Sequence, residues 1–262
     1  RQMCIRDSRS GAPMSMPGMM DTVLNLGLND QSINGLIKQT ENPRFAWDSY
    51  RRFIQMFSNV VMGLDGDLFE NAINVMKQDR GVDEDTELSA EDLQELVDEF
   101  KQIFSENVSA EEYPTLVIDG VVEFPQDPDV QLQLAIEAVF GSWNNPRAIL
   151  YRKQNKISDD LGTAVNVQSM IFGNKGDTSA TGVAFTRNPA NGEKEFYGDY
   201  LVNAQGEDVV AGIRNTSPIS DLKHVEGLED AGRELEEVFT ILENHFRDMC
   251  DIEFTIEQGK LW

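Results

Sequence analysis

The segment Asp251-Ile-Glu-Phe-Thr-Ile-Glu257 decides the fold class of the C-terminal part of the chain. Polar and apolar residues alternate strictly along it, which is the period of a β-strand with one face in a core and the other in solvent. One face carries Asp251, Glu253, Thr255 and Glu257. Carboxylates spaced two residues apart on a strand suit a hard cation such as Mg²⁺. A strand with a merely hydrated face fits the same pattern, so the cation remains one of two interpretations.

Further β-rich runs separated by glycines precede this strand after residue 160. They span 163–172, 181–185 and 196–202, and an amphipathic helix at about 228–249 interrupts them. Gln258-Gly259 then predicts a hairpin turn, although only three residues follow it. We therefore predict a sheet in this part of the chain.

The region before residue 160 has a helical period instead. Apolar residues recur at spacings of three and four from Trp47 to Val61, and Ser89 with Asp92 forms a capping box before a second amphipathic stretch. Another helix follows Pro128 and ends near Asn145. We predict a mainly helical region over roughly 28–125, with a short strand or loop between Tyr113 and Gln126.

Composition narrows the classes of function. The 262 residues include 22 Lys and Arg against 46 Asp and Glu, so the net charge is −24. Nucleic acids and anionic membranes need a basic surface, and we exclude both as partners. The chain contains no apolar run long enough to span a membrane and no signal-peptide pattern, so we predict a cytoplasmic protein. Two cysteines and two histidines do not provide a disulfide framework or a zinc site.

Two loops have the composition of phosphate-binding segments. Gly173-Asn-Lys-Gly-Asp-Thr-Ser-Ala-Thr-Gly182 combines glycines with hydroxyl groups, and Arg9 heads a stretch rich in glycine, proline and methionine that ends at Asp21. Taken alone, the pattern of the first loop favours a flexible hairpin connection between strands, and the loop is not a Walker loop because Gly-Lys-Ser/Thr is absent. Arg44, Arg51, Arg52, Arg147 and Arg152 add local positive charge, although isolated surface arginines are common.

Residues 1–8 match nothing that follows. They begin Arg1-Gln-Met-Cys-Ile-Arg-Asp7, and we predict a leader translated from a sequencing adapter, which we exclude from the prediction of the fold. A coding record without the adapter string at this position would contradict that origin.

From Arg9 onward the sequence resembles the pyruvate, phosphate dikinase family. Its Met-Pro-Gly-Met-Met-Asp run, residues 16–21, distinguishes it from the related phosphoenolpyruvate synthases. The likeness is carried by Arg9-Ser-Gly-Ala12, 15–30, 42–53, 145–152, 173–176, 181–189, 203–212 and 251–261.

The resemblance implies an α+β fold, an ATP-grasp-type nucleotide-binding domain with a mainly helical insertion. We expect the first ATP-grasp subdomain to comprise 9–28 and 126–170, the helical subdomain 29–125, and a β-rich ATP-grasp subdomain 171–262. In the family, this domain transfers the β,γ-pyrophosphoryl group of Mg–ATP to a histidine on a separate domain, and a third domain phosphorylates pyruvate.

The resemblance also assigns site residues, position by position. Arg9 corresponds to a phosphate-clamping arginine, Gly18 and Met20 to a loop beside the phosphates, and Thr181 and Gly182 to part of a glycine-rich lid. Glu207 corresponds to a nucleotide-site carboxylate. Asp251 and Glu253 correspond to the carboxylates that hold Mg²⁺ and ATP, and Arg9 and Glu253 are the catalytic candidates. We expect these residues to converge on one cleft. His224 and His245 match no phosphohistidine motif, and we interpret both as ordinary helix or loop residues.

The comparison with the family predicts a fragment truncated at both ends. A glycine loop and an ATP-contacting lysine are expected before Arg9, and a Gln-Thr-Arg motif after Trp262. The acceptor histidine and the pyruvate domain are expected elsewhere, so we predict that the chain alone is inactive. The full-length enzyme is expected to form a homo-oligomer, and an organelle-targeting segment would precede this chain.

Two other interpretations stay open at this point. One is another dikinase relative, such as a phosphoenolpyruvate synthase or a glucan, water dikinase. The other is a non-catalytic acidic interaction module, supported only by the dense negative charge between Asp83 and Glu99.

Overall fold

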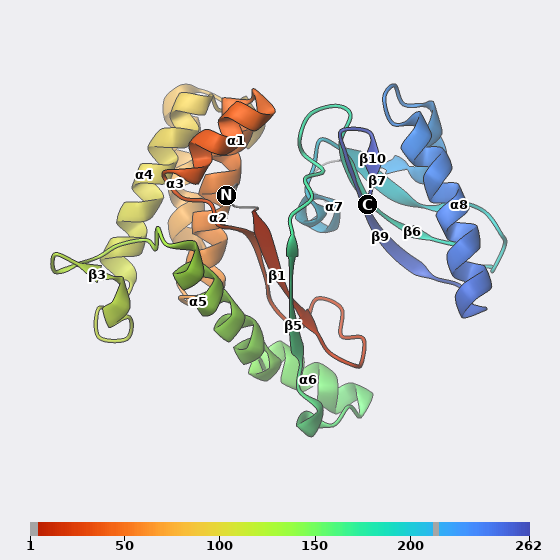
Figure 1. Cartoon of the computed structure of the whole chain (residues 1–262), viewed down its shortest axis with the longest axis horizontal. Helices are drawn as coiled ribbons and strands as arrows, with labels where there is room; N and C mark the ends of the chain where they lie inside the picture. The colour runs from red at the N-terminus through yellow and green to blue at the C-terminus, as the bar shows by residue number, and fades with distance from the viewer. Residues whose placement is uncertain (1–4, 212–214) are drawn as a thin grey trace. The chain divides into compact units, whose positions relative to one another are not determined.

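The computed structural model describes residues 5–211 and 215–262 (Figure 1). The chain divides into two compact units, Arg1–Met170 and Ile171–Trp262. In the described part of the chain, no helix is long and apolar enough to cross a membrane.

A three-stranded antiparallel sheet organises the first unit. Strand β1 (Arg6–Gly11) lies between β2 (Thr22–Leu26) and β5 (Ala164–Ser169). The β-rich sequence pattern after residue 160 groups β5 with the later strands. In the structure, however, β5 pairs with β1 along its whole length. Residues 6–8, which the sequence analysis assigns to an adapter-derived leader, pair with β5, and the Asp7 and Ser8 side chains are buried. Their proposed adapter origin stays a prediction, and residues 1–4 lie outside the described part.

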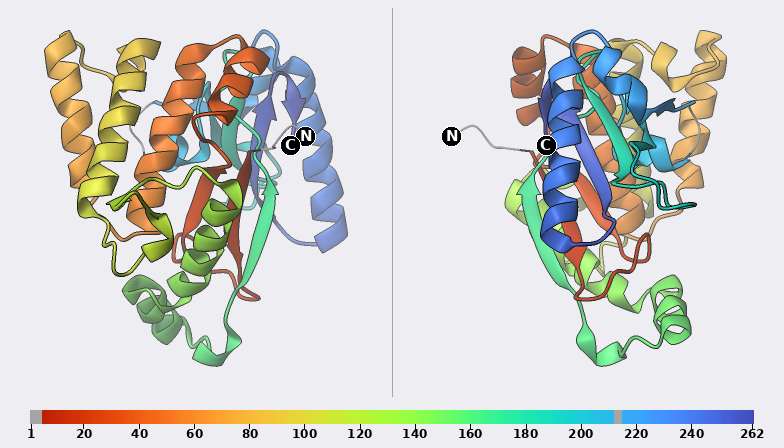
Figure 2. Two further views of the ribbon diagram at one scale, coloured as in Figure 1. Left: turned by 60° about the vertical axis from the view of Figure 1, so that its left-hand side comes forward. Right: turned by 90° about the vertical axis from the view of Figure 1, so that its right-hand side faces the viewer.

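Four helices follow β2, and they confirm the predicted helical region. They are α1 (Ser32–Thr40), α2 (Pro43–Val60), α3 (Asp67–Arg80) and α4 (Ala90–Asn107), with a 3₁₀ turn η1 (Asp85–Glu87) before α4. The Asn42 side chain caps α2, which has a proline at its first position, and Ser89 with Asp92 forms the predicted capping box of α4. Figure 2 shows these helices packed as a bundle.

An aromatic cluster fills the core of this bundle. Tyr50, Phe53 and Phe57 of α2 are fully buried, and the Phe124 ring packs edge-on against all three. Phe104 of α4 contacts Phe124 from another direction, with ring centroids 5.3 Å apart. The predicted core face of α2 is confirmed, with its end residues Trp47 and Val61 only half-buried.

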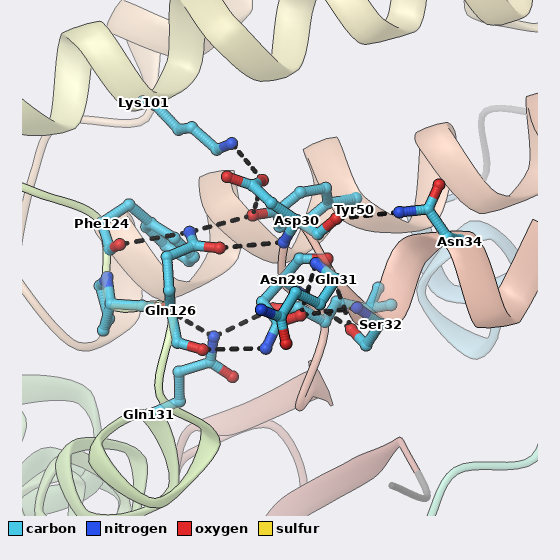
Figure 3. Close-up of polar contacts among 12 residues, drawn as sticks. Asn29, Asp30, Gln31, Ser32, Asn34, Tyr50, Lys101, Phe124, Gln126 and Gln131 are labelled. Carbon is cyan, nitrogen blue, oxygen red and sulfur yellow. Dashed lines mark hydrogen bonds and ion pairs between the residues drawn. The ribbon is translucent and has the colours of Figure 1, made fainter. Parts of the chain in front are cut away.

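A polar network joins the turn after β2 to the helices (Figure 3). The buried Tyr50 hydroxyl donates to Asp30 Oδ1 at 2.9 Å, and Lys101 of α4 binds the same carboxylate. Burial raises the pKa of the Tyr50 hydroxyl, so it remains a donor. Gln126 and Gln131 hold the other side of the turn, with Gln131 Nε2 donating to the Leu28 carbonyl at 2.9 Å. The network therefore fixes where α1 begins relative to α2 and α4.

The rest of the first unit leads back to the sheet. A 3₁₀ turn η2 (Pro114–Leu116) and a small hairpin, β3 (Val117–Ile118) with β4 (Val121–Val122), occupy the segment predicted as a short strand or loop. Helix α5 (Pro128–Gly141), 3₁₀ turn η3 (Ser142–Asn144), helix α6 (Pro146–Asn155) and 3₁₀ turn η4 (Asp159–Leu161) then precede β5.

The second unit is a five-stranded antiparallel sheet in the order β10-β9-β6-β7-β8. Its strands are β6 (Ala180–Phe185), β7 (Tyr197–Val202), β8 (Ser217–Pro218), β9 (Asp251–Glu257) and β10 (Lys260–Leu261). Short helix α7 (Gly206–Ala211) and 3₁₀ helix η5 (Ile219–His224) connect strands, and α8 (Glu229–Phe246) lies along the sheet (Figures 1 and 2).

The hydrophobic core of the second unit lies between the sheet and α8. Phe254 and Ile256 of β9 pack there with Leu235 and Phe239 of α8. The opposite face of β9 carries the acidic side chains, so the predicted alternation is confirmed and one face of the sheet is free of α8.

Candidate functional site

Asp251 and Glu253 stand on the sheet face opposite α8, and we call them the carboxylate pair. Register places Asp251 beside Phe185 and Glu253 beside Val183 of β6, which fixes the backbone of both positions. Both side chains are exposed, and among the described residues neither takes part in an ion pair or hydrogen bond. Mg²⁺ is usually bound by one or two protein carboxylates together with phosphate oxygens of the substrate. Two exposed carboxylates fit this requirement. The described residues contain no cluster of three or more metal-binding side chains, so they form no all-protein metal cage.

Thr181 and Gly182 lie in the central strand β6, and their assignment to a lid stays a prediction. Both are paired with β7 on one side and β9 on the other. Thr181 is 6% exposed, and its hydroxyl donates to the Phe254 carbonyl at 3.2 Å. At Gly182 a Cβ would lie 2.6 Å from the Phe254 ring and from the Asp199 carbonyl oxygen. Glycine is required at this position because the strand packs tightly.

The glycine-rich loop itself, residues 173–179, is anchored on two sides. The Ala204 N–H donates to the Gly173 carbonyl at 3.0 Å, and the Gly259 N–H of the β9–β10 turn donates to the Thr178 carbonyl at 2.7 Å. A Cβ at Gly173 would lie 2.4 Å from the Ala204 carbonyl oxygen, so only glycine allows this approach. These contacts contradict the interpretation of the loop as a merely flexible connection.

An ion pair also attaches this loop to β9. Lys175 Nζ lies 2.5 Å from Glu257 Oε1, the Lys175 side chain is 7% exposed, and Phe172 N–H donates to the other Glu257 oxygen at 2.7 Å. Glu257 shares its strand face with the carboxylate pair, so the loop is held at one end of that face.

Glu207 lies in α7, directly after the segment that contacts the glycine-rich loop. Its backbone is described, whereas its side chain lies outside the described part of the structure. Its assignment as a nucleotide-site carboxylate stays a prediction.

In the first unit, Arg9 occupies β1 with its side chain 44% exposed. Its Nε donates to Asp7 Oδ2 at 2.6 Å. Asp7 is 1% exposed, so the pair fixes the Nε side of the half-exposed guanidinium. An arginine held this way offers a fork that suits phosphate oxygens.

Gly18 and Met20 belong to the connection between β1 and β2. Gly18 adopts a φ of 69°, in the region that favours glycine, and the Met19 N–H closes a turn onto the Met16 carbonyl at 3.2 Å. Met16 is buried against Trp143 and Ala148, and Met19 and Met20 pack against the same cluster. The connection is therefore an ordered loop attached to η3 and α6.

The five other arginines singled out in the sequence are engaged by carboxylates or carbonyls; they are Arg44, Arg51, Arg52, Arg147 and Arg152. Arg51 and Arg52 bind Asp48, and Arg44 donates to the Asp85 and Leu88 carbonyls. Arg147 binds Asp21, and buried Arg152 binds Asp159 and stacks on Trp143. The histidines lie at the end of η5 and within α8, as the sequence analysis expects.

Two features of the site are absent from the sequence prediction. The Lys175–Glu257 pair joins residues 82 positions apart, and Asp21 joins Asn145 and Arg147 across more than 120 positions. The periodicity of each segment carries no signal for such contacts. A lysine inside a glycine-rich loop, together with Glu257 on the face of the carboxylate pair, is the only hint in the sequence.

Arg9 belongs to the first unit, and Thr181, Glu207 and the carboxylate pair belong to the second. Their expected convergence on one cleft therefore stays a prediction.

An α+β chain with an exposed carboxylate pair, an anchored glycine-rich loop and an exposed arginine has the parts of a nucleotide-binding domain. Comparison with known families agrees with this class. The chain belongs to the family described as pyruvate phosphate dikinase, AMP/ATP-binding domain, whose model matches residues 5–224. The carboxylate pair lies beyond the matched residues.

Curated relatives extend the similarity to 97% of the chain. It is 57% identical over 254 residues to pyruvate, phosphate dikinase of Clostridium symbiosum and 53% identical over 264 residues to that of Rhizobium meliloti (strain 1021). A chloroplastic pyruvate, phosphate dikinase of Mesembryanthemum crystallinum is 54% identical over 254 residues. The chain spans about a quarter of the length of these relatives, 28%, 28% and 25% respectively.

Proposed function

We propose that this chain is the ATP-binding part of a pyruvate, phosphate dikinase. In the proposed reaction, ATP, pyruvate and phosphate are converted to AMP, phosphoenolpyruvate and pyrophosphate, and the β,γ-pyrophosphoryl group passes first to a histidine on another domain. Membership of the AMP/ATP-binding family supports this assignment, and the exposed carboxylate pair is the observation that carries it. The names of the curated relatives favour this reaction over that of a phosphoenolpyruvate synthase.

In this proposal, each site residue has its own role in binding the triphosphate. Phosphoryl transfer requires positioning and neutralisation of charge more than covalent chemistry by the protein. Arg9 presents its outer guanidinium nitrogens to phosphate oxygens, and backbone around Gly18 and Met20 lies beside them. Asp251 and Glu253 would hold Mg²⁺, and the ion would supply positive charge that shields the phosphates. Thr181 and Gly182 contribute the strand that carries this face, and Glu207 contacts the nucleotide.

The remaining parts of the proposal concern the longer protein. The acceptor histidine, the pyruvate site and the phosphate acceptor chemistry belong to domains outside this chain, and we propose that the whole protein is a homo-oligomer. The acidic interaction module is disfavoured because the charges that suggest it have local roles: Glu87 caps η1, and Asp92 caps α4 and binds Arg80.

Titration calorimetry with Mg–ATP tests the proposal. We expect weak binding by this chain, above the micromolar range, because a triphosphate approaches a chain of net charge −24 with few cationic groups free to bind it. Glu253→Gln should weaken that binding about tenfold, the effect of losing one metal ligand. Glu237→Gln, an exposed carboxylate of α8, makes the same change in net charge and should leave affinity unchanged. Undiminished affinity in Glu253→Gln would show that the carboxylate pair is not the nucleotide site.

A further inference from the structure

A cluster of polar groups on η3 and α6 holds the loop between β1 and β2. The Asp21 N–H donates to Ser142 Oγ at 3.1 Å, and Asn145 Nδ2 donates to Asp21 Oδ2 at 2.9 Å. Arg147 binds the other Asp21 oxygen through Nη2 and donates from Nε to the Met19 carbonyl at 3.0 Å. We call Asp21, Asn145 and Arg147 the loop clamp.

The clamp grips the loop on both sides of Met20. One planar guanidinium fixes the Met19 carbonyl and the Asp21 carboxylate at the same time, so the residue between them has little freedom. Lysine lacks this two-point geometry because its ammonium is a single point of charge. The turn from Met16 to Met19 and the packing of Met16 on Trp143 fix the other end of the loop.

Stability of the fold does not explain this arrangement. The Arg147 side chain is 53% exposed and the Asp21 side chain 17% exposed, and an ion pair with one partner this open to solvent contributes about 1 kcal/mol or less.

We propose that Arg147, acting through Asp21, is a positioning residue for the nucleotide site. It sets the backbone around Gly18 and Met20 in the shape that lies beside the phosphates, and it does not itself bind ATP. This inference rests on the proposed function, because the loop matters only if the chain binds a nucleotide.

Trp143 provides a spectroscopic reporter, since Met16, Met19 and Met20 all pack in its cluster. In a Trp47→Phe, Trp262→Phe background, its fluorescence is recorded during titration with Mg–ATP. Arg147→Ala and Arg147→Lys are compared with Arg80→Ala, which removes an arginine of similar exposure whose ion pairs lie between α3 and α4. Hydrogen exchange of residues 16–22 and the urea midpoint are measured for each variant.

We expect Arg147→Ala to weaken Mg–ATP binding about tenfold and to speed exchange of residues 16–22, with the urea midpoint unchanged. Arg147→Lys should recover part of the affinity, and Arg80→Ala should bind as the background does. Unchanged affinity in Arg147→Ala, or a loss of affinity matched by a loss of stability, would overturn the positioning role and leave the proposed function intact. Absence of Mg–ATP binding by the background itself, confirmed by calorimetry on the unsubstituted chain, would overturn both.

Discussion

Asp48 is the residue at which the buried charges of the first unit meet. Its carboxylate accepts from Arg51 Nε at 2.9 Å and from Arg52 Nε at 3.0 Å, and Arg51 also binds Asp85. Burial opposes ionisation, but these guanidinium groups hold the pKa of the Asp48 carboxyl below its ordinary value. Because the folded pKa is lowered, the ionised carboxylate stabilises the fold above the ordinary aspartate pKa of about 3.9. That stability is lost as the pH falls through the lower folded pKa.

Asp48→Asn should therefore destabilise the first unit by about 3 kcal/mol at pH 7, since Arg51 is left buried without its closest anion. The difference should begin to shrink as the pH falls below about 4, where the aspartate of the unfolded chain takes up a proton, and it should vanish below the lower folded pKa, where the carboxylate in the fold is itself protonated. Urea unfolding at pH 7 and pH 3, followed by tryptophan fluorescence in a Trp262→Phe background, measures both values. Glu95→Gln removes an exposed partner of Arg80 and serves as the control. An equal loss at both pH values would contradict the role of the charge.

Gly182 tests the strand interpretation of its segment. Because the added methyl group would meet the Asp199 carbonyl oxygen at 2.6 Å, which cannot move aside as a side chain can, Gly182→Ala should destabilise the second unit by about 2–3 kcal/mol. Gly206→Ala, where a Cβ meets nothing within 4 Å, should change stability by about 0.5 kcal/mol or less. Thermal unfolding followed by circular dichroism compares the two. Equal unfolding temperatures for the two variants would show that Gly182 does not lie in a tightly packed strand.

At the scale of elements, local patterns predict most of the fold. Period and capping locate α2, α4, α5, α8 and β9, because each of these elements buries one regular face. Pattern does not say which strands pair. The β5 strand lies after residue 160 yet completes the first sheet, and the irregular register between Arg6 and Ser8 depends on contacts of β1 with β2.

At the candidate site, too, local pattern predicts which face a residue occupies but does not predict long-range contacts. Alternation along β9 places Asp251 and Glu253 on one face, and this prediction is confirmed. The assignment of Thr181 and Gly182 to a lid rests on the resemblance to the family and stays a prediction. Glycine and hydroxyl residues are common to loops and to tightly packed strands, and it is the pairing with both neighbouring strands that places these two residues in a strand.

The Lys175–Glu257 ion pair attaches the glycine-rich loop to the sheet, and breaking it should lower the stability of the second unit. Lys175→Met leaves Glu257 with one N–H donor and should cost about 2–3 kcal/mol, because an unpaired, largely buried carboxylate remains. Glu257→Gln should cost a similar amount, and the double variant less than the sum. The matched control is Lys223→Met, whose partner Glu236 and whose own side chain are each about a third exposed; such pairs contribute about 0–1 kcal/mol. Urea unfolding and hydrogen exchange of residues 172–179 report the effect, and additive losses would show that the two residues act independently.

At the scale of the whole molecule, the question is whether Arg9 and Glu253, which belong to different units, serve one nucleotide. A shared ligand makes both residues contribute to a single binding event. Separate ligands would give two binding events, each sensitive to one residue.

We predict a stoichiometry of one Mg–ATP per chain, with Arg9→Ala and Glu253→Gln each weakening that binding event about tenfold, as expected for losing a charged contact to phosphate or metal. Arg233→Ala, an exposed arginine of α8, should leave it unchanged. Calorimetry across Mg–ATP concentrations that saturate the unsubstituted chain measures stoichiometry and affinity together. A second binding event, or an event that only one of the two substitutions weakens, would show that Arg9 and Glu253 do not act on the same triphosphate.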